Sequence, residues 1–209
     1  MILYYTFLQI YIFIREIFFV LPRIKLWRFF FYFQLEYLFF SPYYYALKSA
    51  KGQDIFGYTP LFTFYKLIKP LLSADKFNSF LDLGCGDARL IFLMNICFGL
   101  ESLGLEKNAR LVHKALFIKK ILHCQKMEIK ATDFLQYSWK DYAIIYVAWV
   151  TFEDNLQQAI TLKLEKETKQ GSVVITLSFP VESKLFILER KLSGLFSWGK
   201  TDIYIQRKI

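Results

Sequence analysis

The spacing of hydrophobic residues divides the chain into two parts. Residues 1–45 are apolar almost throughout, whereas from residue 53 onwards short apolar runs alternate with amphipathic stretches. Uninterrupted short runs are typical of strands buried in a parallel sheet, and apolar positions three or four residues apart are typical of helices. The second part therefore predicts an α/β domain in which strands and helices alternate.

The expected elements of this domain follow from the same pattern. After a polar connector at 41–52, helices are predicted over 61–72, 89–98, 108–123 and 155–167. Strands are predicted over 78–83, 103–105, 127–131, 142–150 and 172–177. Pro70 should end or kink the first helix, because proline lacks the amide hydrogen that a helix interior uses. The runs 184–192 and 201–208 flank a turn at 193–200, which predicts an antiparallel hairpin at the sheet edge.

The first 45 residues form a separate, aromatic-rich segment. They hold 19 of the 41 aromatic residues, with Arg15 and Glu16 as an interruption and Arg23, Lys25 and Arg28 after Pro22. Neither apolar run reaches the roughly 20 uncharged residues of a clean membrane span. Aromatic rings beside cations suit the bilayer interface, so we expect association with a membrane surface that faces the cytoplasm. The alternative is a helical appendage packed on residues 46–209 in a cytoplasmic protein.

Charge and cysteine usage exclude several classes of partner. The net charge is +9, but no compact basic stripe stands out, so we expect no nucleic-acid partner. The three cysteines lack the C-x-x-C spacing, which argues against a disulfide framework and a zinc site. We therefore expect no metal.

The candidate chemistry lies in one strand-to-helix turn, Leu81-Asp82-Leu83-Gly84-Cys85-Gly86-Asp87-Ala88-Arg89. Its two glycines permit a tight turn and close backbone approach to a ligand. Glu106 comes twenty residues after Gly86, at the end of the next strand, where a carboxylate can accept both hydroxyls of a ribose. A dinucleotide turn needs a third small residue where Arg89 stands, which disfavours NAD. A glycine-rich turn without a ligand remains the structural alternative.

The run D-L-G-C-G-D-A resembles motif I of the class I S-adenosylmethionine (SAM) methyltransferases, and the likeness covers residues 53–209. It implies a doubly wound, mostly parallel seven-stranded sheet that ends in an antiparallel hairpin. It also implies a SAM site in which Asp82 lies near the methionine ammonium, Gly84 and Gly86 lie against the cofactor, and Glu106 holds the ribose. Asp133 would accept a hydrogen bond from the adenine amino group, with Phe134 against the ring. The alternative for Asp133 is that it caps a helix or turn.

The acceptor should lie at the end of the fourth strand. Trp149, Thr151 and Phe152 stand there and offer a hydrophobic or cation-friendly pocket, with core packing as the alternative for Trp149. The N-P-P-Y sequence of many base-methylating enzymes is absent from this place, which argues against base N-methylation. Methyl transfer from a sulfonium needs alignment more than acid–base catalysis, so no catalytic residue is assigned.

The order of a hydrophobic N-terminus, F-G-Y-T-P and D-L-G-C-G-D-A-R is similar to that of one methyltransferase group. This group comprises the membrane-anchored lysine methyltransferases of the adenine nucleotide translocase and ATP synthase c-subunit type, with their prokaryotic relatives. The resemblance implies a lysine acceptor in a membrane or membrane-near protein, and Tyr58 and Thr59 closing over the cofactor. Ala88 departs from the glycine usual in that group. A lipid or hydrophobic small-molecule acceptor and a non-catalytic membrane adaptor are the alternatives.

Overall fold

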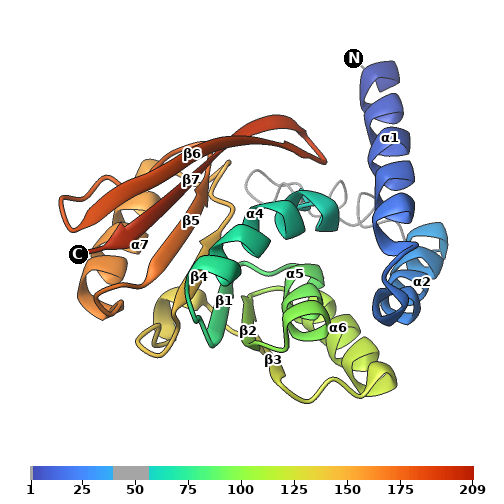
Figure 1. Cartoon of the computed structure of the whole chain (residues 1–209), viewed down its shortest axis with the longest axis horizontal. Helices are drawn as coiled ribbons and strands as arrows, with labels where there is room; N and C mark the ends of the chain where they lie inside the picture. The colour runs from blue at the N-terminus through green and yellow to red at the C-terminus, as the bar shows by residue number, and fades with distance from the viewer. Residues whose placement is uncertain (1, 40–56) are drawn as a thin grey trace.

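A computed structural model describes residues 2–39 and 57–209 as a seven-stranded mixed sheet with helices on both faces (Figure 1). The strand order is β3-β2-β1-β4-β5-β7-β6. The first five strands of that order are parallel to one another, and β7 pairs antiparallel with both β5 and β6. The predicted fold class, a doubly wound and mostly parallel sheet with a terminal antiparallel hairpin, is confirmed.

The strands are β1 (Ser79–Leu83), β2 (Glu101–Glu106), β3 (Met127–Ala131), β4 (Ile144–Val147), β5 (Val173–Leu177), β6 (Phe186–Phe196) and β7 (Gly199–Lys208). The helices are α1 (Ile2–Val20), α2 (Ile24–Phe39), α4 (Leu61–Ala74), α5 (Arg89–Leu93), α6 (Ala109–Leu122) and α7 (Asp154–Glu167). Two short turns are also helical: η1 (Met94–Phe98) is π-helical, and η2 (Phe134–Gln136) is a 3-10 turn.

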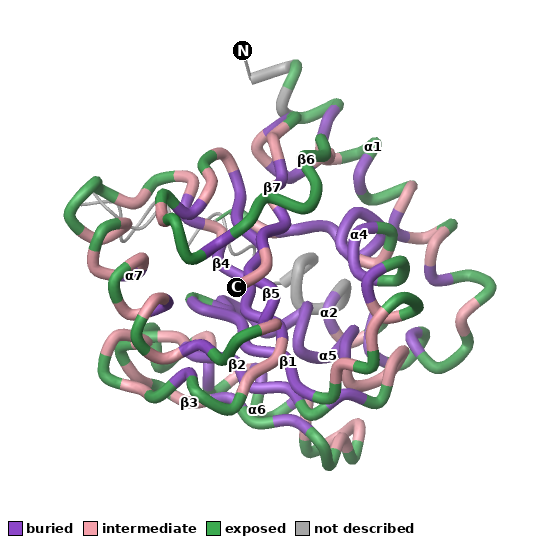
Figure 2. Tube along the Cα trace, turned by 60° about the vertical axis from the view of Figure 1, so that its left-hand side comes forward, coloured by how far each residue is buried: buried purple, intermediate pink, exposed green. Residues whose placement is uncertain are grey.

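Alternation along the central strands builds two cores. Phe80 of β1 packs with residues of α4, α5 and α6, whereas its neighbours Leu81 and Leu83 pack with Ile160 and Leu164 of α7. Every residue of β1 and β5 is buried, as expected for strands covered on both faces (Figure 2). The helices therefore hold the carboxyl ends of β1 to β4 together at one edge of the sheet.

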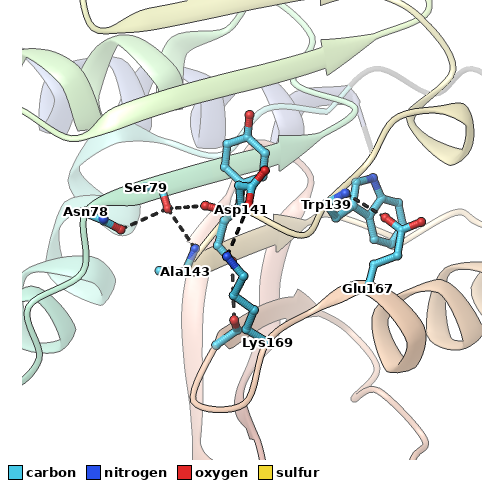
Figure 3. Close-up of polar contacts among 9 residues, drawn as sticks. Asn78, Ser79, Trp139, Asp141, Ala143, Glu167 and Lys169 are labelled. Atoms are coloured by element: carbon cyan, nitrogen blue, oxygen red, sulfur yellow. Dashed lines mark hydrogen bonds and ion pairs between the residues drawn. The ribbon is translucent and has the colours of Figure 1, made fainter.

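Polar contacts fix the register of β1 and β4 at the opposite edge (Figure 3). The Ser79 hydroxyl donates to the carbonyl of Asp141 at 2.9 Å and accepts from the amide of Ala143 at 3.0 Å. The Trp139 amide donates to Glu167 at 2.8 Å, which ties the loop before β4 to the end of α7. These bonds place the start of β4 beside β1, so that Asp82 and Tyr146 are partners in the ladder.

Two local details differ from the simplest expectation. Of the two outcomes expected at Pro70, an end of the helix does not occur, because α4 continues through Pro70 to Ala74. The stretch 193–200 is not a long turn, because β6 and β7 are paired from Ser193↔Asp202 to Phe196↔Gly199. The long hairpin crosses α4 towards α1 (Figure 1), and there the amide of Ser197 donates to the carbonyl of Tyr58. The hairpin is thus longer than its sequence suggests, and its tip is held by residues that are distant in sequence.

The N-terminal segment forms α1 and α2, which lie outside the helices on one face of the sheet. Leu8, Ile12, Glu16 and Val20 are buried at four-residue spacing along α1. Phe29 and Phe33 of α2 are buried as well and pack against Phe92 of α5. Within the described residues, no helix is long and apolar enough to cross a bilayer. The expected boundary between residues 45 and 46 lies outside the described residues.

Candidate cofactor site

The turn after β1 has the backbone of a ligand-binding loop. Gly84 and Gly86 have φ angles of 78° and 56°, in the left-handed region where only glycine is unstrained. The amides of Gly84 and Cys85 both donate to the carbonyl of Leu105, at 2.8 and 3.0 Å. The turn is thereby tied to the end of β2. Ala88 is left-handed too, with φ of 61°, at the place where the related motif has glycine.

Gly104 of β2 makes room for this turn, because a Cβ atom there would lie 2.5 Å from the Cys85 sulfur. We expect Gly104→Ala to push the turn away from β2 and to lower the free energy of unfolding by about 1–3 kcal/mol. Chemical denaturation measures that loss. Cys85→Ala in the same chain removes the clashing sulfur and should restore part of it. Full stability of the single variant would contradict this packing.

Glu106 lies against the turn although twenty residues separate it from Gly86. One carboxylate oxygen accepts from the amide of Gly86 at 2.9 Å, and the other accepts from the amide of Asn108 at 2.8 Å. The amide of Thr132, after β3, donates to the Glu106 carbonyl. The acid is therefore held rigidly between the ends of β1, β2 and β3, where a ribose is expected.

Asp82 carries a buried carboxylate without a protein partner. The residue is 3 % exposed, and no group in the described part of the chain donates a hydrogen bond to its side chain or forms an ion pair with it. Since no fully buried side-chain oxygen among the described residues lacks a partner, the carboxylate oxygens are accessible from the turn. Burial raises the pKa of Asp82 well above its usual value, and the charges of Glu106 and Asp87 raise it further. Such a carboxyl group either binds a proton or is stabilised as a carboxylate by a cation from outside.

The nearest cation of the motif is already paired. Arg89 donates to both oxygens of Asp87, at 3.0 and 2.5 Å, and its guanidinium lies 4.0 Å from the centroid of the Tyr58 ring. Burial tends to raise the pKa of Asp87, but the charge and hydrogen bonds of Arg89, with the charge of Lys114, lower it overall. Arg89 thus neutralises Asp87 and leaves the negative charge of Asp82 for a ligand.

The segment before α4 reaches the same edge of the sheet. The hydroxyls of Thr59 and Tyr146 are 2.6 Å apart in the interior, and Tyr146 is the ladder partner of Asp82. Burial raises the pKa of Tyr146 further above its ordinary value, so the phenol is neutral. Sequence reasoning missed Tyr146, because its partner Thr59 is 87 residues away. The register of β1 and β4 is the signal that identifies it.

Tyr58 connects the site to α1 and to the β6–β7 hairpin. Its amide donates to the Ser197 hydroxyl at 2.8 Å, and its own hydroxyl bonds to Gln9 at 3.4 Å. The Gln9 side-chain amide in turn donates to the Ser197 carbonyl at 2.6 Å. Three segments distant in sequence therefore meet beside Tyr58 and Arg89.

The ends of β3 and β4 hold the remaining candidates. Asp133 is exposed and caps η2, accepting from the amide of Leu135 at 2.9 Å, which is the cap role left open by the sequence. The half-buried rings of Phe134 and Phe152 are stacked with centroids 6.1 Å apart, and Thr151 is exposed nearby in the chain. Trp149 is 1 % exposed and donates to the Phe179 carbonyl, the geometry of a core residue.

Metal binding has no candidate in the part of the chain that is described. No group of three or more histidine, cysteine or acidic side chains there could hold an ion.

Solved structures share this architecture, although no protein-family model and no curated protein matches the sequence. An RNA methyltransferase from Salinibacter ruber, solved with S-adenosyl-L-homocysteine, is 19 % identical, with a TM-score of 0.54 over 67 % of this chain and 88 % of its own. A putative methyltransferase from Escherichia coli is 13 % identical, with a TM-score of 0.60 over 74 % and 88 %. An N-methyltransferase from Bradyrhizobium japonicum is 16 % identical, with a TM-score of 0.56 over 68 % and 92 %. The chain therefore has the Rossmann-like fold of the class I methyltransferases.

Proposed function

We propose that this protein transfers a methyl group from SAM. The observation that supports this most is Asp82, a residue that is 3 % exposed and whose carboxyl group has no partner among the described residues, beside the turn whose Gly86 amide bonds to Glu106. SAM offers an ammonium for the first acid and a ribose diol for the second, while its sulfonium adds a further positive charge. Solved structures of this fold with SAM or S-adenosyl-L-homocysteine are consistent with that cofactor.

The residues present fit such a reaction. The sulfonium supplies an activated methyl group, so the chain has to bind, orient and exclude water. Asp82, Gly84, Gly86 and Glu106 hold the amino-acid and ribose ends of the cofactor. Asp133 and the stacked ring of Phe134 then lie at the strand ends expected for adenine.

Glu106→Ala tests the ribose assignment. Loss of hydrogen bonds to a charged acceptor costs about 1.5–3 kcal/mol, so SAM affinity should fall roughly ten- to a hundredfold. Glu101→Ala, at the exposed start of the same strand, is the matched control and should bind SAM like the wild type. Equal affinities of wild type and Glu106→Ala would remove Glu106 from the site.

For the acceptor, we propose a lysine of a membrane or membrane-near protein. Thr151 is exposed and the ring of Phe152 is half-buried after the end of β4, and together they offer a partly exposed surface that suits an alkyl-ammonium side chain. The aromatic, cationic character of α1 and α2 supports a place at a cytoplasmic membrane surface. The same features fit a lipid or another hydrophobic acceptor, which is the second candidate.

Labelled methyl-SAM incubated with the protein and membrane fractions separates these acceptors. A labelled gel band that yields methyl-lysine on hydrolysis supports the lysine proposal. Label extracted into organic solvent supports a lipid instead. SAM binding without transfer to either would favour a non-catalytic adaptor.

A further inference from the structure

An apolar stripe runs along the outer side of α1. Its members recur every three or four residues and are 45–68 % exposed: Tyr4, Phe7, Tyr11, Ile14, Phe18 and Leu21. The stripe continues at the start of α2 with Ile24, Trp27 and Phe31, of which Ile24 is 83 % exposed. Large rings and aliphatic chains in a continuous row mark an interaction surface.

The charges around the stripe decide what kind of surface it meets. Among the described side chains of α1, of α2 and of the corner between them, the cations are Arg15, Arg23, Lys25 and Arg28. The one described carboxylate, Glu16, is buried and accepts from the amide of Phe62 at the start of α4. The outward charge of the two helices is therefore positive. A second copy would bring like charges together, whereas an anionic surface would be attracted.

An apolar groove with cations at its rim borders the stripe. It lies between the α1–α2 corner and α4, has a volume of about 310 Å³, and is lined by Phe19, Arg23, Tyr65, Lys66, Lys69 and Pro70. Three of these six residues are cations and none is a carboxylate. The Arg23 guanidinium lies between two rings, 4.1 Å from the centroid of Phe19 and 4.5 Å from that of Tyr65.

The groove and the stripe can meet one surface at the same time. Arg15 and Phe19 lie four residues apart on the flank of α1 between its buried row and its exposed stripe. Arg23 follows in the corner after α1, between the exposed residues Leu21 and Ile24. A bilayer touching the stripe would bring its headgroups level with this flank. The chemistry then matches: aromatic and aliphatic side chains enter the interface, and cations face phosphate.

We propose that α1 lies flat on an anionic phospholipid bilayer, with the stripe and the apolar groove in the interface and the cations at the rim of the groove, Arg23, Lys66 and Lys69, facing headgroup phosphates. This rests on the proposed place of the enzyme at a membrane surface and adds the residues that hold it there. A helix of 19 residues is about 28 Å long and covers several headgroups. Because Gln9 bonds to Ser197 and Tyr58, docking would keep the cofactor edge beside the bilayer.

Flotation of the full chain with lipid vesicles tests the proposal. The wild type should float with vesicles of phosphatidylcholine and phosphatidylglycerol, and only weakly with phosphatidylcholine alone. Lys66→Glu with Lys69→Glu should lower the affinity for anionic vesicles roughly ten- to a hundredfold. Leu21→Ser with Ile24→Ser should weaken binding about tenfold without unfolding the protein, because both side chains are exposed.

Lys140→Glu with Lys166→Glu is the matched control, since it makes the same change of net charge at exposed positions near α7. It should leave vesicle binding close to that of the wild type. Three results would overturn the proposal: no flotation of the wild type with anionic vesicles, an equal loss in the control, or a dimer in solution that Leu21→Ser with Ile24→Ser dissolves. SAM binding measured on the same variants reports the cofactor site separately and should not change.

Discussion

Asp82→Asn should weaken SAM binding by roughly thirty- to a thousandfold and at the same time stabilise the ligand-free protein. The variant keeps the shape of the side chain and removes its charge. A buried ion pair that loses one partner costs about 2–4 kcal/mol of binding energy, because the ammonium of the ligand is left without a counter-charge. Without ligand, the wild-type carboxylate is buried near Glu106 and Asp87, so its ionisation opposes folding.

The stabilisation by Asp82→Asn should depend on pH in a defined direction. The pKa of Asp82 is raised in the folded chain, so protonated Asp82 favours folding, and this contribution is lost as pH rises through the folded pKa. The variant should therefore gain most over the wild type at high pH. Urea unfolding at several pH values, with calorimetry of SAM binding, measures both effects. Asp141→Asn, a surface control that is 86 % exposed, should show neither. A variant that binds SAM normally would contradict the role of Asp82.

Glu16→Gln should raise the free energy of unfolding at pH 8 by roughly 3 kcal/mol and have little effect at pH 4.5. Burial raises the pKa of Glu16 from 4.5 to about 7, although the charge of Arg89 and the amides of Phe62 and Leu61 oppose the shift. The stability that protonated Glu16 contributes is complete below pH 4.5 and is lost as pH rises to about 7. A difference of 2.5 pKa units corresponds to roughly 3 kcal/mol.

Glutamine keeps the oxygen that accepts from Phe62, so the start of α4 stays capped. Denaturant unfolding of wild type and variant between pH 4.5 and 8 measures the difference. Glu182→Gln removes an exposed carboxyl and should leave the pH dependence of the wild type unchanged. A gain for Glu16→Gln that is equal at both ends of this pH range would show that Glu16 is not held in a titrating, buried state.

The order of elements and the cofactor turn were predictable because their signals are local. A strand, two glycines and the acid Glu106 follow one another within 26 residues, so the hydrophobic pattern and the residue spacing are enough to identify the turn. The contacts of Thr59 with Tyr146 and of Gln9 with Ser197 join residues 87 and 188 positions apart. No local pattern encodes such pairs, because they depend on how the strands and the long hairpin pack.

The N-terminal helices show the same contrast between features that local sequence predicts and features that depend on distant contacts. In the sequence Glu16 interrupts an apolar run, whereas in the structure it lies in the buried row of Leu8, Ile12 and Val20. The charge of Glu16 makes the four-residue apolar period of that row hard to recognise in the sequence. Glu16 is buried there because it accepts a hydrogen bond from the amide of Phe62 and lies near the charge of Arg89. The aromatic excess was evident from the sequence, but the side of α1 that carries the exposed stripe was not.

Calorimetric titration of SAM into the full chain measures directly whether the turn after β1 binds this cofactor. The full chain is required because Gln9 and Glu16 of α1 bond to Tyr58 and Phe62 next to the site. We expect one SAM per chain, with binding weakened by Asp82→Asn and by Glu106→Ala. A folded chain that takes up no SAM would contradict it and would leave a methyltransferase fold used for another purpose.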